Sequence, residues 1–231
     1  GQIDKKALAA CVENREGLKK LSMERIRDEM LKILLTPNVV KTFRIMMEND
    51  ILSYVLPEPK HLDKLEFLSR LVEEENIPHS ALRRLFTIYQ PDVALAENLA
   101  LRLRLSRKEK ELFVSLAEEK IELAQFLDNK ELPRLIYEYG PEFCVEKLLL
   151  LLSFEQRSIP ALGELIKRIN TMVIPEFPVR GKDIIAQGVE NPQHIGDIIK
   201  ELKNYWIASG FKLTKEELLK IRSRFTAAVG E

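Results

Sequence analysis

The chain of 231 residues is poor in the residue types that build metal sites and disulfide frameworks. It holds two cysteines and three histidines, which are scattered and form no C-x-x-C pair and no histidine pair at metal-ligand spacing on a helix. This scarcity argues against a structural zinc site and a disulfide scaffold, and it is typical of a reducing compartment. We therefore expect a cytoplasmic protein without a metal site.

Net charge and long apolar runs are missing as well. The chain has 36 basic and 36 acidic residues, so the whole molecule has no net field that would attract nucleic acid. Any nucleic-acid site must therefore be a local patch. The most apolar stretch, Leu148 to Leu152, falls far short of the roughly 20 residues that cross a bilayer, and it predicts a buried helix turn. We expect no membrane partner.

Signatures of a self-sufficient active site are also absent from the sequence. It contains no D-x-D pair to hold Mg²⁺ against a triphosphate, and no Gly-Gly or Gly-Ser turn, P-loop or G-x-G-x-x-G motif to grip phosphates. Cys144 lies between Phe143 and Val145, where a small buried thiol is a better interpretation than a nucleophile. We predict no catalytic residue, no metal ligand and no cofactor in this chain.

Helix signals follow one another along most of the sequence, and no convincing strand pair interrupts them. Ser106 and Thr214 each precede a glutamate by three residues, as in a capping box. Gly140 and Gly210 mark helix ends, and Pro37 fits the first turn of the helix that follows it. The pattern predicts an all-α, multi-helical protein. Residues 170–188, with two prolines and two glycines, are its best linker.

Charged residues crowd the start of the helix predicted to run to Leu35. Ser22 fits its N-cap, and the apolar stripe behind the charges begins at Ile26. Glu24, Arg25 and Glu29 lie among these charges, at spacings that allow ion pairs on the helix surface. The allowed pairs are Glu24–Arg27, Arg25–Asp28 and Arg25–Glu29. Local physics alone favours a solvated, self-paired face.

The order of several segments carries a resemblance. "IDKKALAAC", "LKKLSMERIRDEMLKILL" and "MMENDILSYVLPE" follow one another near the start, and "FPVRGKDIIAQGVENPQHIGDIIKELKNYWIASGF" follows near the end. Together they resemble the region after the catalytic head of bacterial CCA-adding tRNA nucleotidyltransferases and their poly(A) polymerase relatives. The resemblance covers residues 3–58 and 176–211, whereas the middle of the chain matches only in being helical.

Two motifs of that family fall on numbered positions here. Its neck contains E-R-I-x-x-E, which Glu24, Arg25, Ile26 and Glu29 match. Its late G-(K/R)-D-(L/I) helix start is matched by Gly181 to Ile184, and its following I-G by Ile195-Gly196. One departure concerns the turn before I-G, where the family often has Pro-Gly-Pro and this chain has Asn191-Pro192-Gln193-His194.

The resemblance implies a neck, body and tail without the nucleotidyltransferase head. The neck remnant would span residues 1–58, the helical body 59–172 and the helical tail 173–231. The head, with its Mg²⁺ and nucleoside triphosphate sites, would lie before residue 1 and would be a partner of this chain, which we expect to be inactive alone. Because the choice between CCA and poly(A) addition depends on the head, the sequence leaves it open.

The resemblance also implies roles for particular charges. Glu24, Arg25 and Glu29 would brace the nucleotide-reading helix of the neck, although surface self-pairing remains an equal alternative. The body and tail would hold tRNA, or another RNA 3′ end, by its phosphates and without a base code. Candidate contacts are Arg102, Arg104, Arg107 and Lys108 in "LRLRLSRKEK", and Arg180 and Lys182 in "VRGKD".

Each candidate cluster has a structural alternative. The first is also explained as a solvated turn in which basic residues complement a helix C-terminus. The second is equally explained as a glycine turn in which Asp183 is the N-cap. For the whole chain, balanced charge and abundant leucine are typical of a non-enzymatic helical scaffold that binds other proteins. The ordered motifs favour the RNA-positioning function over this scaffold.

Overall fold

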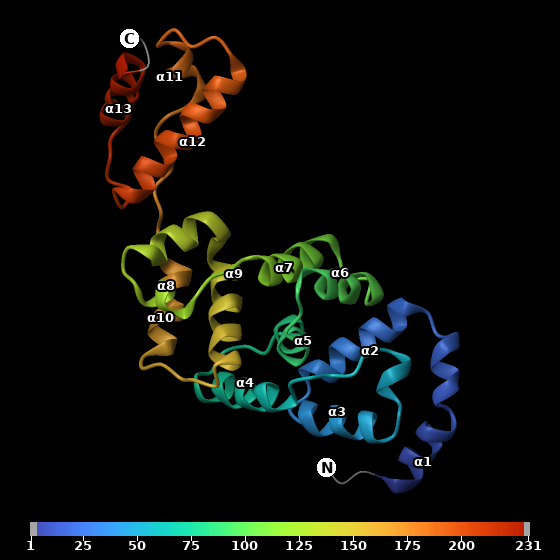
Figure 1. The fold of residues 1–231 in the computed structure, drawn as a ribbon. Coiled ribbons are helices and arrows are strands. Elements are labelled where there is room, and N and C mark those ends of the chain that lie inside the picture. The colour runs from blue at the N-terminus through green and yellow to red at the C-terminus, as the bar shows by residue number, and fades with distance from the viewer. Residues whose placement is uncertain (1–3, 229–231) are drawn as a thin grey trace. The chain divides into compact units, whose positions relative to one another are not determined.

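The computed structural model describes residues 4–228, and their side chains as far as Arg222. Every regular element in this range is a helix, which confirms the all-α prediction (Figure 1). The elements are α1 (Lys5–Glu13), η1 (Arg15–Lys20), α2 (Met23–Leu35), α3 (Val39–Glu48), η2 (Leu52–Tyr54), α4 (Leu62–Glu74), α5 (Ala81–Tyr89), α6 (Val93–Arg102), α7 (Arg107–Glu118), α8 (Leu123–Leu127), α9 (Glu131–Phe154), α10 (Leu162–Thr171), α11 (Gly181–Ile185), α12 (Pro192–Ala208) and α13 (Lys215–Ala228).

The chain divides into two compact units, residues 1–124 with 141–168 and residues 125–140 with 169–231. One boundary falls inside α9 at Gly140, where φ 81° and ψ 161° interrupt the helix. That backbone region is open to glycine, so the sequence signal at Gly140 correctly marked a break. The division into residues 1–58, 59–172 and 173–231 stays a prediction.

Helix ends follow the sequence signals in most places. Ser106 and Glu109 form the expected capping box, with the Ser106 N–H donating to Glu109 Oε2 at 2.7 Å. Thr214 and Glu217 form the second one. The prediction for Pro37 was wrong, because α3 begins only at Val39.

The physical reason for the late start of α3 lies at the end of α2. The backbone N–H of Thr36 and its hydroxyl both donate to the carbonyl of Ile33, at 3.1 and 2.8 Å. These bonds extend the last turn of α2 through Thr36. Pro37 therefore belongs to the turn between the two helices, and Asn38 precedes the first residue of α3.

Two buried arginines on α5 organise the first unit. Arg84 is 1% exposed, and its Nη1 donates to the carbonyls of Leu34 at 2.6 Å and Thr36 at 2.9 Å. These are carbonyls at the end of α2, which have no partner inside the helix. The guanidinium therefore fixes α2 to α5, which lie side by side (Figure 1).

Other buried cations serve the same purpose. Arg83, 3% exposed, donates to the carbonyl of Pro78 at 2.5 Å and lies 3.7 Å from the carboxylate of Glu146 on α9. Lys147, also on α9, donates to the carbonyls of Leu116 and Glu119 at the end of α7, at 2.8 and 2.7 Å. A cation at a helix C-terminus satisfies carbonyls and complements the helix dipole. Buried cations thus join α2, α5, α7 and α9.

The leucine-rich half of α9 is the apolar centre of this unit. Leu148, Leu149, Leu150 and Leu152 are fully buried, as the sequence predicted. Across residues 4–228, no helix combines the length and apolar character that a membrane crossing requires.

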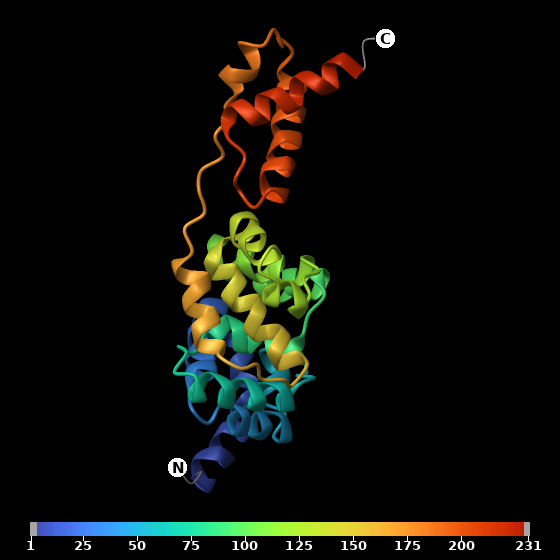
Figure 2. The same ribbon diagram turned by 90° about the vertical axis from the view of Figure 1, so that its left-hand side faces the viewer.

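The second unit has a separate aromatic core. Trp206 on α12 is 1% exposed and makes edge-to-face contacts with Tyr137, Phe177 and Phe211 at centroid distances of 4.9 to 5.6 Å. Residues 172–180 reach this core as an extended stretch, which Figure 2 shows between α10 and α11. Of the predicted linker, residues 170–171 still belong to α10, residues 172–180 are non-helical, and α11 begins at Gly181.

Replacing Arg84 tests its role in holding α2. In Arg84→Met the carbonyls of Leu34 and Thr36 lose their donor, and we expect the free energy of unfolding to fall by about 2–4 kcal/mol. Chemical denaturation measures this loss. Arg70→Gln, which removes an exposed arginine paired with Glu74 on α4, is the control and should cost less than about 0.5 kcal/mol. Equal costs for the two variants would contradict the role of Arg84.

His79 makes the stability of this region depend on pH. Its Nδ1 lies 2.8 Å from Arg84 Nη2 and must accept a hydrogen bond, so its ring is neutral. Burial, and secondarily the charge of Arg84, lower the pKa of His79 below its ordinary 6.5. Below pH 6.5 the unfolded chain therefore binds more protons than the folded one, and stability should decrease as the pH falls through the folded pKa.

The variant His79→Gln keeps an acceptor for Arg84 but does not titrate. We expect it to lose part of the decrease in unfolding free energy between pH 6.5 and pH 5, measured by urea denaturation. His61, whose pKa burial also lowers, should account for a remaining part. An unchanged pH dependence in His79→Gln would show that folding does not lower the pKa of this histidine.

Candidate nucleic-acid interface

In the turn between α6 and α7, a residue with a charged side chain adopts a strained backbone conformation. At the end of α6, the N–H of Leu105 donates to the carbonyl of Ala100 and the N–H of Arg104 donates to the carbonyl of Leu101. This is the Schellman arrangement, in which the residue between helix and loop is left-handed and usually glycine. Here that residue is Arg104, with φ 45°.

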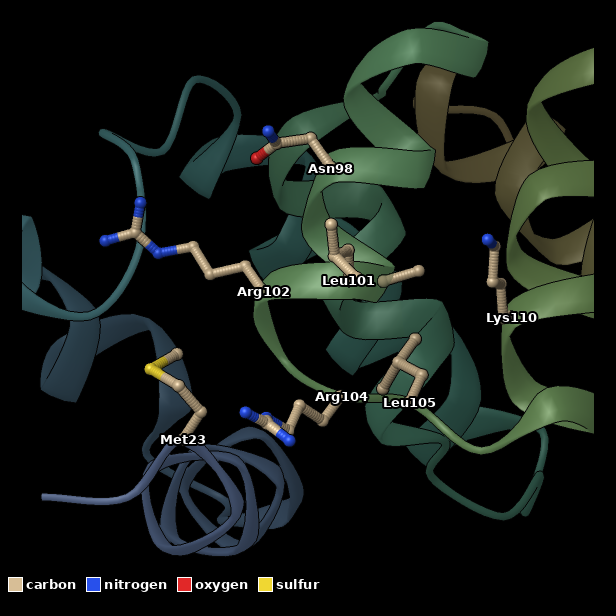
Figure 3. Close-up of a pocket in the computed structure, with 8 residues that line it drawn as sticks. Met23, Asn98, Leu101, Arg102, Arg104, Leu105 and Lys110 are labelled. Carbon is tan, nitrogen blue, oxygen red and sulfur yellow. The ribbon is translucent and has the colours of Figure 1, made fainter.

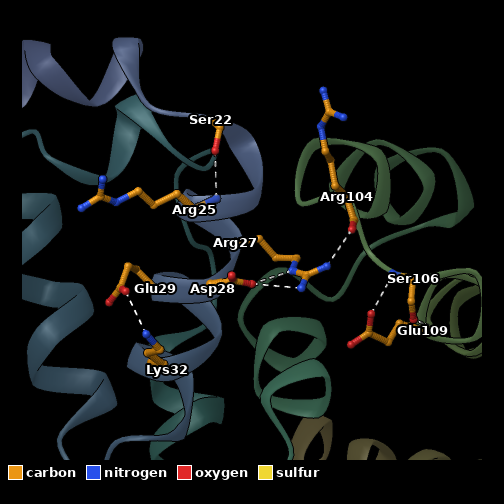
Figure 4. Close-up of polar contacts among 9 residues, drawn as sticks. All are labelled: Ser22, Arg25, Arg27, Asp28, Glu29, Lys32, Arg104, Ser106 and Glu109. Atoms are coloured by element: carbon orange, nitrogen blue, oxygen red, sulfur yellow. Dashed lines mark hydrogen bonds and ion pairs between the residues drawn. The ribbon is translucent and has the colours of Figure 1, made fainter.

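Arg104 also joins this turn to the first half of α2. Its carbonyl accepts a hydrogen bond from Arg27 Nη1 at 3.2 Å, and its own guanidinium lies 2.9 Å from the carboxylate of Glu24. Figure 4 shows Arg27 reaching from α2 to the turn, with Asp28 beside it. The predicted RNA contact Arg104 and the predicted neck residue Glu24 are thus partners.

A pocket of about 740 Å³ opens at the corner where the start of α2 meets the α6–α7 turn. Figure 3 shows its side chains coming from three elements: Met23 from the start of α2, Leu101 and Arg102 from the end of α6, and Lys110 from α7. Leu101, which is 75% exposed, lines this pocket together with Arg102, Arg104 and Lys110. The full lining is Met23, Asn98, Ala100, Leu101, Arg102, Arg104, Leu105 and Lys110.

Arg102 is held in one orientation at the edge of this pocket. Its Nε donates to the carbonyl of Val55 at 2.7 Å, which satisfies the end of η2. The two terminal nitrogens of the guanidinium have no hydrogen-bond or ion-pair partner among the described residues. The side chain is therefore fixed through one nitrogen and offers the other two to a ligand, an arrangement suited to a phosphate.

The remaining residues of the predicted basic cluster make surface ion pairs. Arg107 pairs with Glu111 along α7 at 2.8 Å, and Lys108 pairs with Glu142 at 2.8 Å. Lys110, which sequence reasoning did not select, lines the pocket, and its ammonium has no partner within the described part of the chain. The structure thus brings Arg102 and Arg104 together with Lys110 at one pocket. Arg104, Arg107 and Lys108 have carboxylate partners, whereas Arg102 and Lys110 have none among the described residues. Their RNA-binding roles stay predictions.

The chain is similar to enzymes that add CCA to tRNA. A profile of the family described as "Probable RNA and SrmB-binding site of polymerase A" matches residues 2–62. CCA tRNA nucleotidyltransferase 1, mitochondrial, from Homo sapiens is 30% identical over 227 residues, covering 95% of this chain and 50% of the relative. The CCA-adding enzyme of Enterococcus faecalis is 25% identical over 240 residues, covering 94% of this chain and 54% of the relative. These matches support a portion of a protein of the CCA-adding tRNA nucleotidyltransferase family.

The chain spans about half the length of the curated relatives it matches. Among its described residues, no group of three or more His, Cys, Asp or Glu side chains is placed to hold a metal ion. Cys144 is fully buried, and burial raises the pKa of its thiol to about 12, as expected for a structural cysteine.

The residues of the predicted neck motif lie on the surface of α2. Glu29 pairs with Lys32 at 2.9 Å, and Glu24 pairs with Arg104. The side chain of Arg25 is exposed and has no partner among the described residues, as Figure 4 illustrates. The three pairs that spacing allowed do not form, because Glu24, Asp28 and Glu29 have other partners. The bracing role of these residues stays a prediction.

The second predicted cluster, in the other unit, is organised by Asp183. The backbone N–H of Arg180 donates to its carboxylate at 2.8 Å, and Lys215 on α13 contacts the same carboxylate at 2.5 Å. These hydrogen bonds, first the one from Lys215, lower the pKa of Asp183. Asp183 is the third residue of α11 and not its N-cap, which corrects that alternative. The side chains of Arg180 and Lys182 are exposed.

Comparing two substitutions of Arg104 tests the strain at this turn. Both Arg104→Gly and Arg104→Ala lose the exposed ion pair with Glu24, but only alanine keeps a Cβ in the left-handed region. We expect Arg104→Gly to be more stable than Arg104→Ala by about 1 kcal/mol in chemical denaturation. If alanine were equal to or better than glycine, the left-handed conformation at Arg104 would be in doubt.

Proposed function

We propose that this chain is the RNA-positioning portion of a template-independent nucleotidyltransferase that extends the 3′ end of tRNA. The observation that carries the proposal is the pocket at the α6–α7 corner, where Arg102, Arg104 and Lys110 meet an exposed Leu101. The names of the relatives, which are CCA-adding enzymes, favour CCA addition over poly(A) addition.

Phosphate contacts suit this task, since an enzyme that serves all tRNAs must hold them without reading their sequence. Arginine and lysine bind phosphates irrespective of base and release counterions as they do so. The chain has no net charge, so long-range attraction is weak and the affinity rests on local clusters. We therefore expect the affinity of the chain for tRNA to be modest and to fall as salt rises.

The chemistry itself would belong to a catalytic head that acts together with this chain. Mg²⁺ and nucleoside triphosphates would be bound there, and the residues described here would only position the RNA. Arg107, Lys108, Arg180 and Lys182 are further proposed contacts. A cytoplasmic location is also a proposal, and the human relative is named as mitochondrial.

Binding of tRNA is the direct test of this proposal. We expect the isolated chain to bind different tRNAs with similar affinity in fluorescence anisotropy, and to bind less tightly as salt rises. The double variant Arg102→Gln/Arg104→Gln should weaken binding and lower the slope of log affinity against log salt by about one to two phosphate contacts. Arg180→Gln/Lys182→Gln tests the second cluster in the same way.

The control is Lys41→Gln on α3, which removes an exposed lysine that has no partner among the described residues. It should leave the affinity and the salt slope unchanged. Thermal unfolding of every variant shows whether the fold is intact. Should the chain fail to bind tRNA at low salt, or bind it with no salt dependence, the RNA-positioning function would be excluded for this chain and the helical scaffold would take its place.

A further inference from the structure

The pocket of Figure 3 adjoins two others on the same unit. One, of about 520 Å³, is lined by Arg15, Lys19, Asp50, Ser53, Tyr54 and Arg102. The other, of about 410 Å³, is lined by Arg107, Lys110, Glu111, Val114 and Ser115. Arg102 lines both the pocket of Figure 3 and the 520 Å³ pocket, and Lys110 lines both the pocket of Figure 3 and the 410 Å³ pocket, so these side chains lie where neighbouring pockets meet. We call the three adjoining pockets the cationic track.

Three cations of the cationic track have no carboxylate partner among the described residues. Arg15 donates only to the carbonyl of Asn49 at 3.2 Å, Arg102 only to that of Val55, and Lys110 has no partner. Each of the three pockets contains at least one of these cations. Positive charge that internal ion pairs do not neutralise is therefore available along the whole track.

The other cations of the track are neutralised by neighbours. Lys19 pairs with Glu16 at 2.8 Å, Arg104 with Glu24 and Arg107 with Glu111. These exposed pairs are weak and screened by salt, so they reduce the positive charge of the track but do not prevent it from binding an anion. The three cations without a carboxylate partner are thus the better candidates for tight contacts with an anion.

Apolar and aromatic surface alternates with this charge. Leu101 is 75% exposed and lies with Met23 in the central pocket. Tyr54 lies in the pocket that contains Arg15, and its hydroxyl is fixed by a 2.7 Å hydrogen bond to Glu16. Alternating cations and flat or apolar side chains are typical of surfaces that bind phosphates and unstacked bases together.

We propose that the cationic track holds a single-stranded segment of RNA, with phosphates at Arg15, Arg102 and Lys110 and bases against Leu101, Met23 and Tyr54. The inference rests on the proposed RNA-positioning function and specifies the form of RNA that this site takes. An A-form duplex presents phosphates and 2′-hydroxyls but keeps its base faces stacked, so it cannot use the apolar surface between the cations. Each pocket has the volume of an ordinary small-ligand site, which suits one unstacked nucleotide.

Arg102 is the residue on which this arrangement centres. It lies between two pockets, and its hydrogen bond to Val55 fixes the plane of the guanidinium before any ligand arrives. A cation that is already oriented loses less conformational freedom when it binds a phosphate. Lys110, which has a flexible stem and no partner, extends the contact to the third pocket.

The test compares two forms of RNA on the whole chain. A labelled, unstructured RNA of about 12 nucleotides serves as the single-stranded probe, and an RNA duplex of the same length serves as the competitor. We expect the single strand to bind about tenfold more tightly than the duplex, and to compete with tRNA for the chain. Equal or tighter binding of the duplex would overturn the single-strand assignment.

Variants then locate the binding site. Lys110→Glu reverses a charge with no partner and cannot disturb an internal contact, so its fold should stay intact in thermal unfolding. It should weaken single-strand binding about tenfold at low salt. Arg15→Gln should weaken it less and lower the salt slope by about 0.7, the value for one single-stranded phosphate. Lys41→Glu, the charge-matched control on α3, should change binding less than twofold.

The outcomes separate the two proposals. If tRNA binds but the single strand does not, or if Lys110→Glu and Arg15→Gln behave like Lys41→Glu, the cationic track is wrong and the proposed function stands. If neither tRNA nor single-stranded RNA binds, both are overturned. Weakened single-strand binding in the two track variants, with an intact fold and an unaffected control, supports the track.

Discussion

The first unit depends on a buried guanidinium that completes another helix. Arg84 lies inside the unit and gives its hydrogen bonds to the last carbonyls of α2, which a helix cannot satisfy by itself. Nη1 and Nη2 of Arg84 are hydrogen-bonded, whereas its buried Nε has no partner among the described residues. Because a buried charge is costly unless it is hydrogen-bonded, these bonds restrict how α2 and α5 can meet. Its neighbour Arg83 carries the same constraint to α9 through Glu146.

The position of α2 in turn determines the candidate site. The end of α2 is fixed by Arg84, and its beginning carries Glu24 and Arg27 to the α6–α7 turn. Buried cations that donate to backbone carbonyls therefore hold the helices together. The cations at the corner that make no such contact are exposed. Arg102 combines both roles, since one nitrogen supports η2 and two remain available. This division explains how a chain with no net charge still presents a basic surface.

Sequence patterns predicted the features that local physics controls. The features that depend on neighbouring residues alone were predicted correctly. They are the capping boxes at Ser106 and Thr214 and the break at Gly140. Contacts between distant segments were not predictable in this way. Spacing suggested that Glu24 would pair along its own helix, but its partner Arg104 lies in another turn. Lys110 was missed because only the folded structure shows which lysines line a pocket and lack a carboxylate.

We propose that RNA is held at the corner where α2 meets the α6–α7 turn. Backbone hydrogen exchange of the whole chain, measured by mass spectrometry with and without tRNA, tests it most directly, because it reports every segment at once. If the RNA lies at this corner, bound tRNA slows exchange in residues 101–110, and also in residues 15–20 and 52–55. Slowed exchange confined to residues 172–222, or no change at any segment while tRNA is bound, would contradict it.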